Sequence, residues 1–211
     1  MSAARQDVLV AHTRLSGFGY TAELAFPVSR GVDRIDVRAV ASAPPPSASG
    51  CSTRAAPAYQ SPAFRGVYGN ERHGFWVATR DAAPGFLPGP ITAVSGRWCS
   101  RCSAACRPPD VEVTVRLRHG PVVAPLTPAP VPELVRDHPG WYREDLHVHS
   151  TASSDAFATG SALAPEAWGE ECRRAGLDLL TDHNVVAQNR ALAGAARSAP
   201  PCAAAPACAC C

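Results

Sequence analysis

The chain has 211 residues and a formal net charge of +2, so it can form one ordinary domain or two small ones. This small charge gives no electrostatic argument for binding nucleic acid or an anionic membrane surface. The sequence contains no run of about 18 apolar residues and no apolar leader core, so we expect no membrane-spanning helix and a cytoplasmic location. With 21 Pro, 16 Gly and 18% charged residues, long irregular stretches are expected.

Residues 1–120 are typical of a β-rich, sandwich-like region. Apolar and polar residues alternate in several segments, which predicts strands with one buried face. The clearest of these segments are residues 20–26, 34–38 and 111–117, and residues 74–78 form a shorter one. Two stretches, residues 41–66 and 95–109, have no periodicity, so we expect inserts that form loops or are disordered. The Pro-rich residues 121–140 are predicted to be a linker.

Residues 141–194 have a different pattern, which predicts a β-α-β unit of a parallel α/β arrangement. Residues 145–149 and 177–180 are the expected strands, and residues 165–175 are the expected helix. Pro165 suits the first helical turn, and Gly176 suits the position after the helix ends. The apolar stripe of this helix is expected to contain Trp168, Cys172 and Ala175. The Ala/Pro/Cys-rich residues 195–211 are predicted to be a disordered tail.

Metal-ligating side chains follow the two strands of this unit. His147 and His149 flank Val148, so both imidazoles are expected on one face at the carboxyl end of the first strand. Asp155 lies in the following loop, and Asp182-His183 ends the next strand, which should lie beside the first. His-x-His alone is weak evidence for a site, but its conjunction with the other elements is specific. Ligand-type side chains are thus expected to converge at the carboxyl ends of two neighbouring strands, which predicts a metal site there.

The same residues carry a family resemblance. Residues 145–151, followed by Ser154-Asp155, Pro165-Glu166, residues 175–178 and residues 181–184, resemble the first two motifs of the PHP (polymerase and histidinol phosphatase) superfamily. The lead-in at residues 140–149 is most similar to the CehA/McbA-type metallohydrolases of that superfamily. Upstream, residues 26–37 and 84–90 resemble the β-sandwich prefix of the same branch.

The resemblance implies a distorted (β/α)7 barrel that binds two or three divalent ions, usually Zn²⁺, Mn²⁺ or Fe²⁺. It implies hydrolysis of a small phosphoester or other ester by metal-activated water. His147, His149, Asp155 and His183 match ligand positions, and Asp182 would orient a ligand or a bound water. The present chain would therefore be the β-α-β stub of such a barrel, preceded by the sandwich-like region. No partner protein is implied.

The chain also departs from the family pattern. The strand before Thr181 is two residues shorter, which is expected to set His183 back by about 7 Å. Ala164 stands where a capping Ser or Asp is expected, a loss of about 1 kcal/mol. The 28 residues after His183, 184–211, contain no counterparts of the family's later ligands. We therefore expect an incomplete barrel with both strand edges unpaired.

Two readings of function follow from these matches and departures. By lineage the chain is a PHP-type metal-dependent hydrolase. The alternative is a catalytically inactive fragment, truncated or frame-shifted, that is at most a β-sandwich binding module. Frame-shifted translation would account for residues 41–66, 95–109 and 195–211, which contain most of the nine cysteines. In the second of these stretches, Cys99, Cys102 and Cys106 have the spacing of a thiolate site but lack a partner pair.

The remaining His and Trp residues are isolated in the sequence. Four histidines have no partner at ligand spacing and are predicted to lie on the surface or in turns; they are His12, His73, His119 and His138. Three tryptophans are predicted to be packing residues, namely Trp76, Trp98 and Trp141.

Overall fold

The computed structural model describes residues 5–14, 21–42, 48–52, 64–69, 73–93, 95–101, 110–121, 124–126, 139–153, 163–183 and 203–204. The chain divides into two compact units, Met1–Pro128 and Ala129–Cys211. Strands dominate the described part of the first unit. The described ranges contain one α-helix, and it is neither long enough nor apolar enough to cross a membrane.

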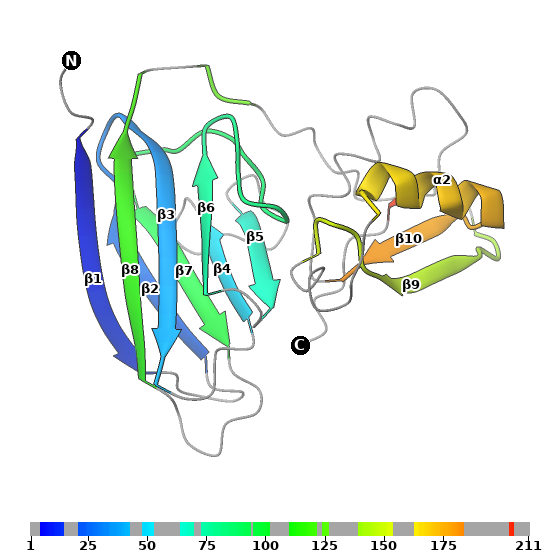
Figure 1. Cartoon of the computed structure of the whole chain (residues 1–211), viewed down its shortest axis with the longest axis horizontal. Coiled ribbons are helices and arrows are strands. Elements are labelled where there is room, and N and C mark those ends of the chain that lie inside the picture. Colours follow the sequence, from blue (N-terminus) through cyan, green and yellow to red (C-terminus); the bar gives the residue numbers. More distant parts are fainter. Residues whose placement is uncertain are drawn as a thin grey trace. The chain divides into compact units, whose positions relative to one another are not determined.

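The first unit is built from two four-stranded antiparallel sheets (Figure 1). One sheet has the order β1-β8-β3-β6 and comprises β1 (Gln6–Arg14), β8 (Asp110–His119), β3 (Val32–Ala41) and β6 (Gly74–Ala78). The other has the order β2-β7-β4-β5 and comprises β2 (Thr21–Pro27), β7 (Ser95–Arg101), β4 (Ala48–Ser52) and β5 (Phe64–Gly69).

One apolar core joins these two sheets face to face. In β8 the alternation predicted from the sequence is confirmed, because Val111, Val113 and Val115 are at most 1% exposed while Glu112 faces solvent. The same cluster takes Phe26 from β2 and Trp98 from β7. Burial of each large apolar side chain stabilises the unit by about 1.5–3 kcal/mol. The first unit is therefore a two-layer β structure, as its alternating segments predicted.

Strands also occupy part of the two stretches that were expected to be loops or disordered. β4 lies within residues 41–66, and β7 lies within residues 95–109. β7 pairs with β2 on one side and β4 on the other, and its Trp98 is fully buried. The expectation was therefore wrong for β4 and β7, and also for Ala41 and residues 64–66, which belong to β3 and β5. Apart from Ser42, the other residues of those stretches lie outside the described part of the chain.

A glycine explains why the alternation of β7 was not recognised. Gly96 shares the inward face with Trp98, and a Cβ placed there would overlap the ring of Phe26. An apolar side chain at this position is therefore excluded by the close approach of its neighbour. The strand keeps its period of two, but only Trp98 marks it in the sequence.

The described part of the second unit contains a three-stranded parallel sheet and one helix, and the helix and two of these strands are labelled in Figure 1. The elements are β9 (Glu144–Val148), α2 (Pro165–Ala175), β10 (Leu179–Asp182) and β11 (Ala203–Ala204), and the strand order is β11-β10-β9. The predicted β-α-β order is confirmed, and the described residues form no barrel. The expectation that both edges are unpaired was wrong for β10, because residues Ala203 and Ala204 of the supposed tail pair with it.

The ends of α2 follow the sequence signals. Ala164 makes no side-chain capping bond, and Gly176 takes the left-handed conformation at φ 68°. The N–H of Gly176 donates to Arg173 O at 3.1 Å, which terminates the helix. Of the expected apolar stripe, Cys172 is buried and Trp168 is half-buried, whereas Ala175 is exposed. Cys172 and Trp168 pack with Val148 and Leu177 into a small second cluster.

Candidate metal centre

Three imidazole rings gather at the carboxyl ends of β9 and β10. The ring centres of His147 and His149 are 4.9 Å apart, as the period of the strand predicts for two residues that flank the buried Val148. The ring centre of His183 lies 4.7 Å from that of His147 and 5.0 Å from that of His149. Three of the four predicted ligands are thus brought together from two strands, while Asp155 lies outside the described residues.

An irregularity in β9 keeps His183 level with the other two rings. Leu180 pairs with Asp145 and Asp182 pairs with Val148, so three steps along β9 match two steps along β10. This extra residue in β9 is a β-bulge. Beyond it, the N–H of His183 donates to Val148 O at 2.9 Å. The expected displacement of His183 along the short strand therefore does not separate it from its partners.

The separations of the three ring centres are close to those of imidazoles that bind one ion. Imidazoles bound to one Zn²⁺ at about 2.1 Å have ring centres roughly 4.6–5.3 Å apart, and the observed separations lie in this range. The planes of His147 and His183 are only 6° apart, so these two rings are stacked. In the described part of the chain no group of three or more His, Cys, Asp or Glu side chains is arranged so that it could hold a metal ion. The rings are gathered, and the described ligands alone do not make a cage.

Asp182 fixes the backbone directly after His149. It is 1% exposed, its Oδ1 accepts the Ser150 N–H at 3.0 Å, and its Oδ2 accepts the Ser150 hydroxyl. Burial raises the pKa of the Asp182 carboxyl, while the hydrogen bonds from Ser150 and the backbone N–H of His183 oppose this rise. Asp182 was expected to orient a ligand or a water, and its described bonds position His149 through the chain.

Two further side chains hold the site and were given no such role by the sequence. Trp168 of α2 donates its indole N–H to His149 O at 3.1 Å. The Ser153 hydroxyl donates to His183 O at 3.2 Å and lies 3.5 Å from His149 Nδ1. The signal that was available for Ser150 and Ser153 is their position, since small polar residues directly after a strand commonly bond nearby backbone.

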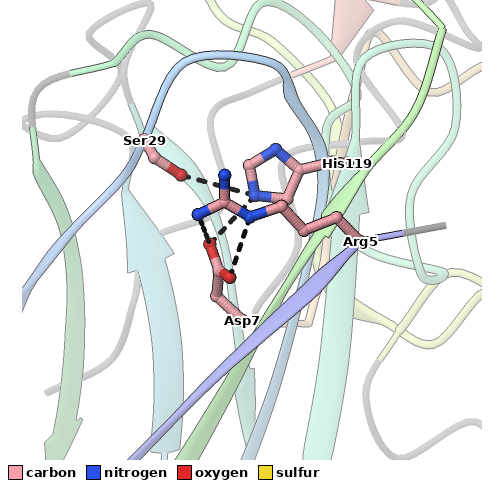
Figure 2. A network of polar contacts seen from close by, with 4 residues as sticks. All are labelled: Arg5, Asp7, Ser29 and His119. Atoms are coloured by element: carbon pink, nitrogen blue, oxygen red, sulfur yellow. Dashed lines mark hydrogen bonds and ion pairs between the residues drawn. The ribbon is translucent and has the colours of Figure 1, made fainter.

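A separate polar network surrounds His119 in the first unit (Figure 2). His119 Nε2 lies 3.0 Å from Asp7 Oδ2 and 3.4 Å from Ser29 Oγ, so this residue is not the isolated surface residue that was predicted. Arg5 also binds Asp7, and the bonds from His119 and Arg5 lower the pKa of the Asp7 carboxyl. The two partners of His119 share one ring nitrogen, whereas a hydrolytic triad uses both. The network therefore ties strand ends together and is not a nucleophilic site.

The other isolated residues have mixed outcomes. His12 and His73 are exposed as predicted, and His138 lies outside the described residues. Trp98 is a packing residue, but Trp141 is fully exposed at 102%. Cys102 and Cys106 lie outside the described residues, so a thiolate site that includes Cys99 stays a prediction.

Comparisons of the chain with models of protein families, with curated proteins and with solved structures found no match.

Proposed function

We propose that the second unit carries a divalent-metal site of the PHP type, descended from hydrolases of small phosphoesters or other esters. The observation that carries this proposal is the gathering of His147, His149 and His183 at the ends of two parallel strands, with ring centres within 5.0 Å of one another. Parallel α/β folds place their sites at this edge. The motif likeness of residues 145–184 supports the same lineage.

In this proposal each residue has a defined part. The three imidazoles supply nitrogen ligands for Zn²⁺, Mn²⁺ or Fe²⁺, and Asp155 supplies a carboxylate. A divalent ion bound there would lower the pKa of a coordinated water and stabilise negative charge on an ester oxygen. Asp182 holds the Ser150 backbone and hydroxyl, and Trp168 holds His149 O, so the protein itself fixes where His149 lies.

A second candidate is a catalytically inactive relative that keeps part of this site and acts at most as a binding module. Two observations favour it. No group of three or more described His, Cys, Asp or Glu side chains is arranged so that it could hold a metal ion. The parallel sheet of the described part consists of β9, β10 and the two-residue β11, which by themselves enclose no barrel interior.

Metal analysis and a hydrolysis assay separate the two candidates. The purified full chain would be loaded with Zn²⁺ or Mn²⁺, dialysed, analysed for bound metal and assayed with bis(p-nitrophenyl) phosphate and p-nitrophenyl acetate. We expect stoichiometric metal and turnover that both disappear in His147→Ala and persist in the control His73→Ala. Metal that depends on His147 without turnover supports the inactive relative. Absence of bound metal from the folded chain contradicts both the site and the lineage.

A further inference from the structure

The outer face of the sheet β1-β8-β3-β6 carries exposed valines among charged and polar residues. The described residues include five exposed large hydrophobic side chains, and Val8, Val10 and Val40 of this face are three of them at 54%, 53% and 43% exposure. The register places Val8 opposite Arg116 and Val40 opposite Glu112. Side chains directly opposite each other on paired strands share one face of the sheet. Valines and charged residues are thus interleaved on this face.

The positive charge of this face is only partly compensated. Asp36 accepts hydrogen bonds from Arg34 at 2.6 Å and from Arg118 at 2.7 Å, so one carboxylate serves two guanidinium groups. Arg38 and Arg116 have no ion-pair partner among the described residues. The Glu112 carboxylate lies on the same face but is likewise not paired with either arginine in that part of the chain.

The two uncompensated arginines are neighbours. Arg116 is opposite Asp36 and Arg38 is opposite Thr114, which makes them a diagonal pair on adjacent strands. Long side chains at diagonal positions of adjacent strands are within reach of each other. An anionic group placed between these two arginines would therefore be within reach of both guanidinium groups.

A hollow lies at the same place. It has a volume of about 400 Å³, and Arg38, Arg116, His73 and Trp76 contribute to its lining. The Arg34 guanidinium lies 4.0 Å from the centroid of the Trp76 ring, so one side of the indole is already occupied by a cation. The hollow thus offers two guanidinium groups and the remaining indole surface to a ligand, while the Asp36 carboxylate, which also lines it, is already bonded to Arg34 and Arg118.

We propose that this surface, the arginine–valine face formed by Val8, Val10, Arg38, Val40, Trp76 and Arg116, is a docking site for an acidic polypeptide segment that also carries apolar side chains. Carboxylates of the segment pair with Arg38 and Arg116, and its apolar side chains cover the valines. Arg and Trp are enriched at the centres of protein interfaces. This site is independent of the metal centre and uses different residues.

A single-stranded nucleic acid fits the same face less well. Such ligands need several phosphate contacts and free aromatic platforms for the bases. The face has two uncompensated arginines, and Arg34 covers one side of Trp76. Exposed valines make no stacking platform, whereas they suit the aliphatic side chains of a polypeptide.

Isothermal titration calorimetry with the full chain tests the proposal. The probe is a short acetylated and amidated peptide in which Glu and Val alternate, and the control probes are the same peptide with Gln for Glu and an oligothymidylate. We expect saturable binding of the Glu–Val peptide that weakens with salt, and no saturable binding of the Gln–Val peptide. Arg38→Gln with Arg116→Gln should weaken binding by about tenfold or more. Val8→Thr with Val10→Thr should weaken it severalfold.

Matched variants keep this test decisive. Arg30 and Arg80 are exposed and lie outside the arginine–valine face, so the double variant Arg30→Gln/Arg80→Gln removes the same charge and should bind as the unmodified chain does. Far-ultraviolet circular dichroism checks that each variant is folded. The proposal is overturned if the peptide does not bind, if both double arginine variants weaken binding equally, or if oligothymidylate binds more tightly than the peptide.

Discussion

Different interactions stabilise the interiors of the two units. The first has a continuous cluster of 16 buried apolar residues shared by two sheets. Among the described residues of the second, Val148 and Cys172 are the buried apolar ones, and the other buried side chains are polar, such as Ser150 and Asp182. Apolar burial stabilises without regard to direction, whereas hydrogen bonds fix geometry. The candidate site is thus found among described residues that directional bonds hold in place.

The largest effect should follow from removing the anchor of the first unit. Trp98 is fully buried between the sheets. We expect Trp98→Ala to lower the free energy of unfolding by about 3–5 kcal/mol, because it removes apolar contacts and leaves a cavity. Urea denaturation followed by circular dichroism measures this change.

The exposed Trp141 provides the matched control for that experiment. Trp141→Ala should change the free energy of unfolding by less than about 0.5 kcal/mol, because the side chain buries no surface. Equal effects of the two substitutions would mean that β7 and its tryptophan are not part of the core. Trp98→Phe should lower the free energy of unfolding less than Trp98→Ala does, since the buried indole N–H has no hydrogen-bond partner in the described structure.

In the second unit the larger effect should come from Asp182. Asp182→Ala leaves two buried donors of Ser150 without an acceptor, at a cost of about 1–3 kcal/mol. We expect this loss of stability to appear as faster hydrogen exchange of the Ser150 and His183 amides, while the exchange rates in the strands of the first unit stay unchanged. Asp182→Asn keeps one acceptor oxygen and should therefore destabilise the unit less than Asp182→Ala does. Unaltered exchange in Asp182→Ala would show that the buried carboxylate does not hold this loop.

A smaller effect is expected for the bond between α2 and the strand end. Trp168→Phe keeps an aromatic ring and removes the indole N–H that donates to His149 O. The expected loss is about 0.5–1.5 kcal/mol, a typical net value for one hydrogen bond. Nuclear magnetic resonance of the His149 ring should show a change of environment that the control Trp141→Phe does not produce. Identical His149 spectra in both variants would contradict the proposed role of Trp168.

The smallest effect concerns pH and the network of His119 in the first unit. The hydrogen bonds from His119 and Arg5 lower the pKa of Asp7 below the ordinary value of 3.8. The Asp7 carboxylate therefore stabilises the folded chain above that pH. This contribution is lost as the pH falls through the lowered pKa. Asp7→Asn should therefore reduce the thermal midpoint slightly at neutral pH, and the difference should shrink in acid. A difference that grows in acid would have the wrong sign for this network.

The sequence predicted those elements whose side chains carry a visible period. β8 and α2 were predicted because Val111, Val113 and Val115 alternate and because Pro165 and Gly176 bound the helix. β7 was not, because the inward Gly96 leaves no apolar alternation, and the need for a glycine there arises from a neighbour, Phe26. Tertiary contacts of this kind are not visible in a local window.

The candidate site was predictable in part for the same reason. Strand parity places His147 and His149 together, and the β-α-β order brings His183 to them. The bulge in β9 that sets the level of His183 was not predictable, because a register shift depends on the pairing of two distant segments. The bonds of Ser150 and Trp168 to Asp182 and His149 O likewise depend on that pairing.

The most direct test of the gathered histidines is a Co²⁺ titration of the full chain followed by visible absorption spectroscopy. We expect ligand-field bands that saturate, with affinity reduced at least about tenfold in each of His147→Ala, His149→Ala and His183→Ala, and unchanged in His12→Ala. His12 is exposed on β1 and serves as the control. Absence of the bands, or bands that survive all three substitutions, would contradict a metal centre at the ends of β9 and β10.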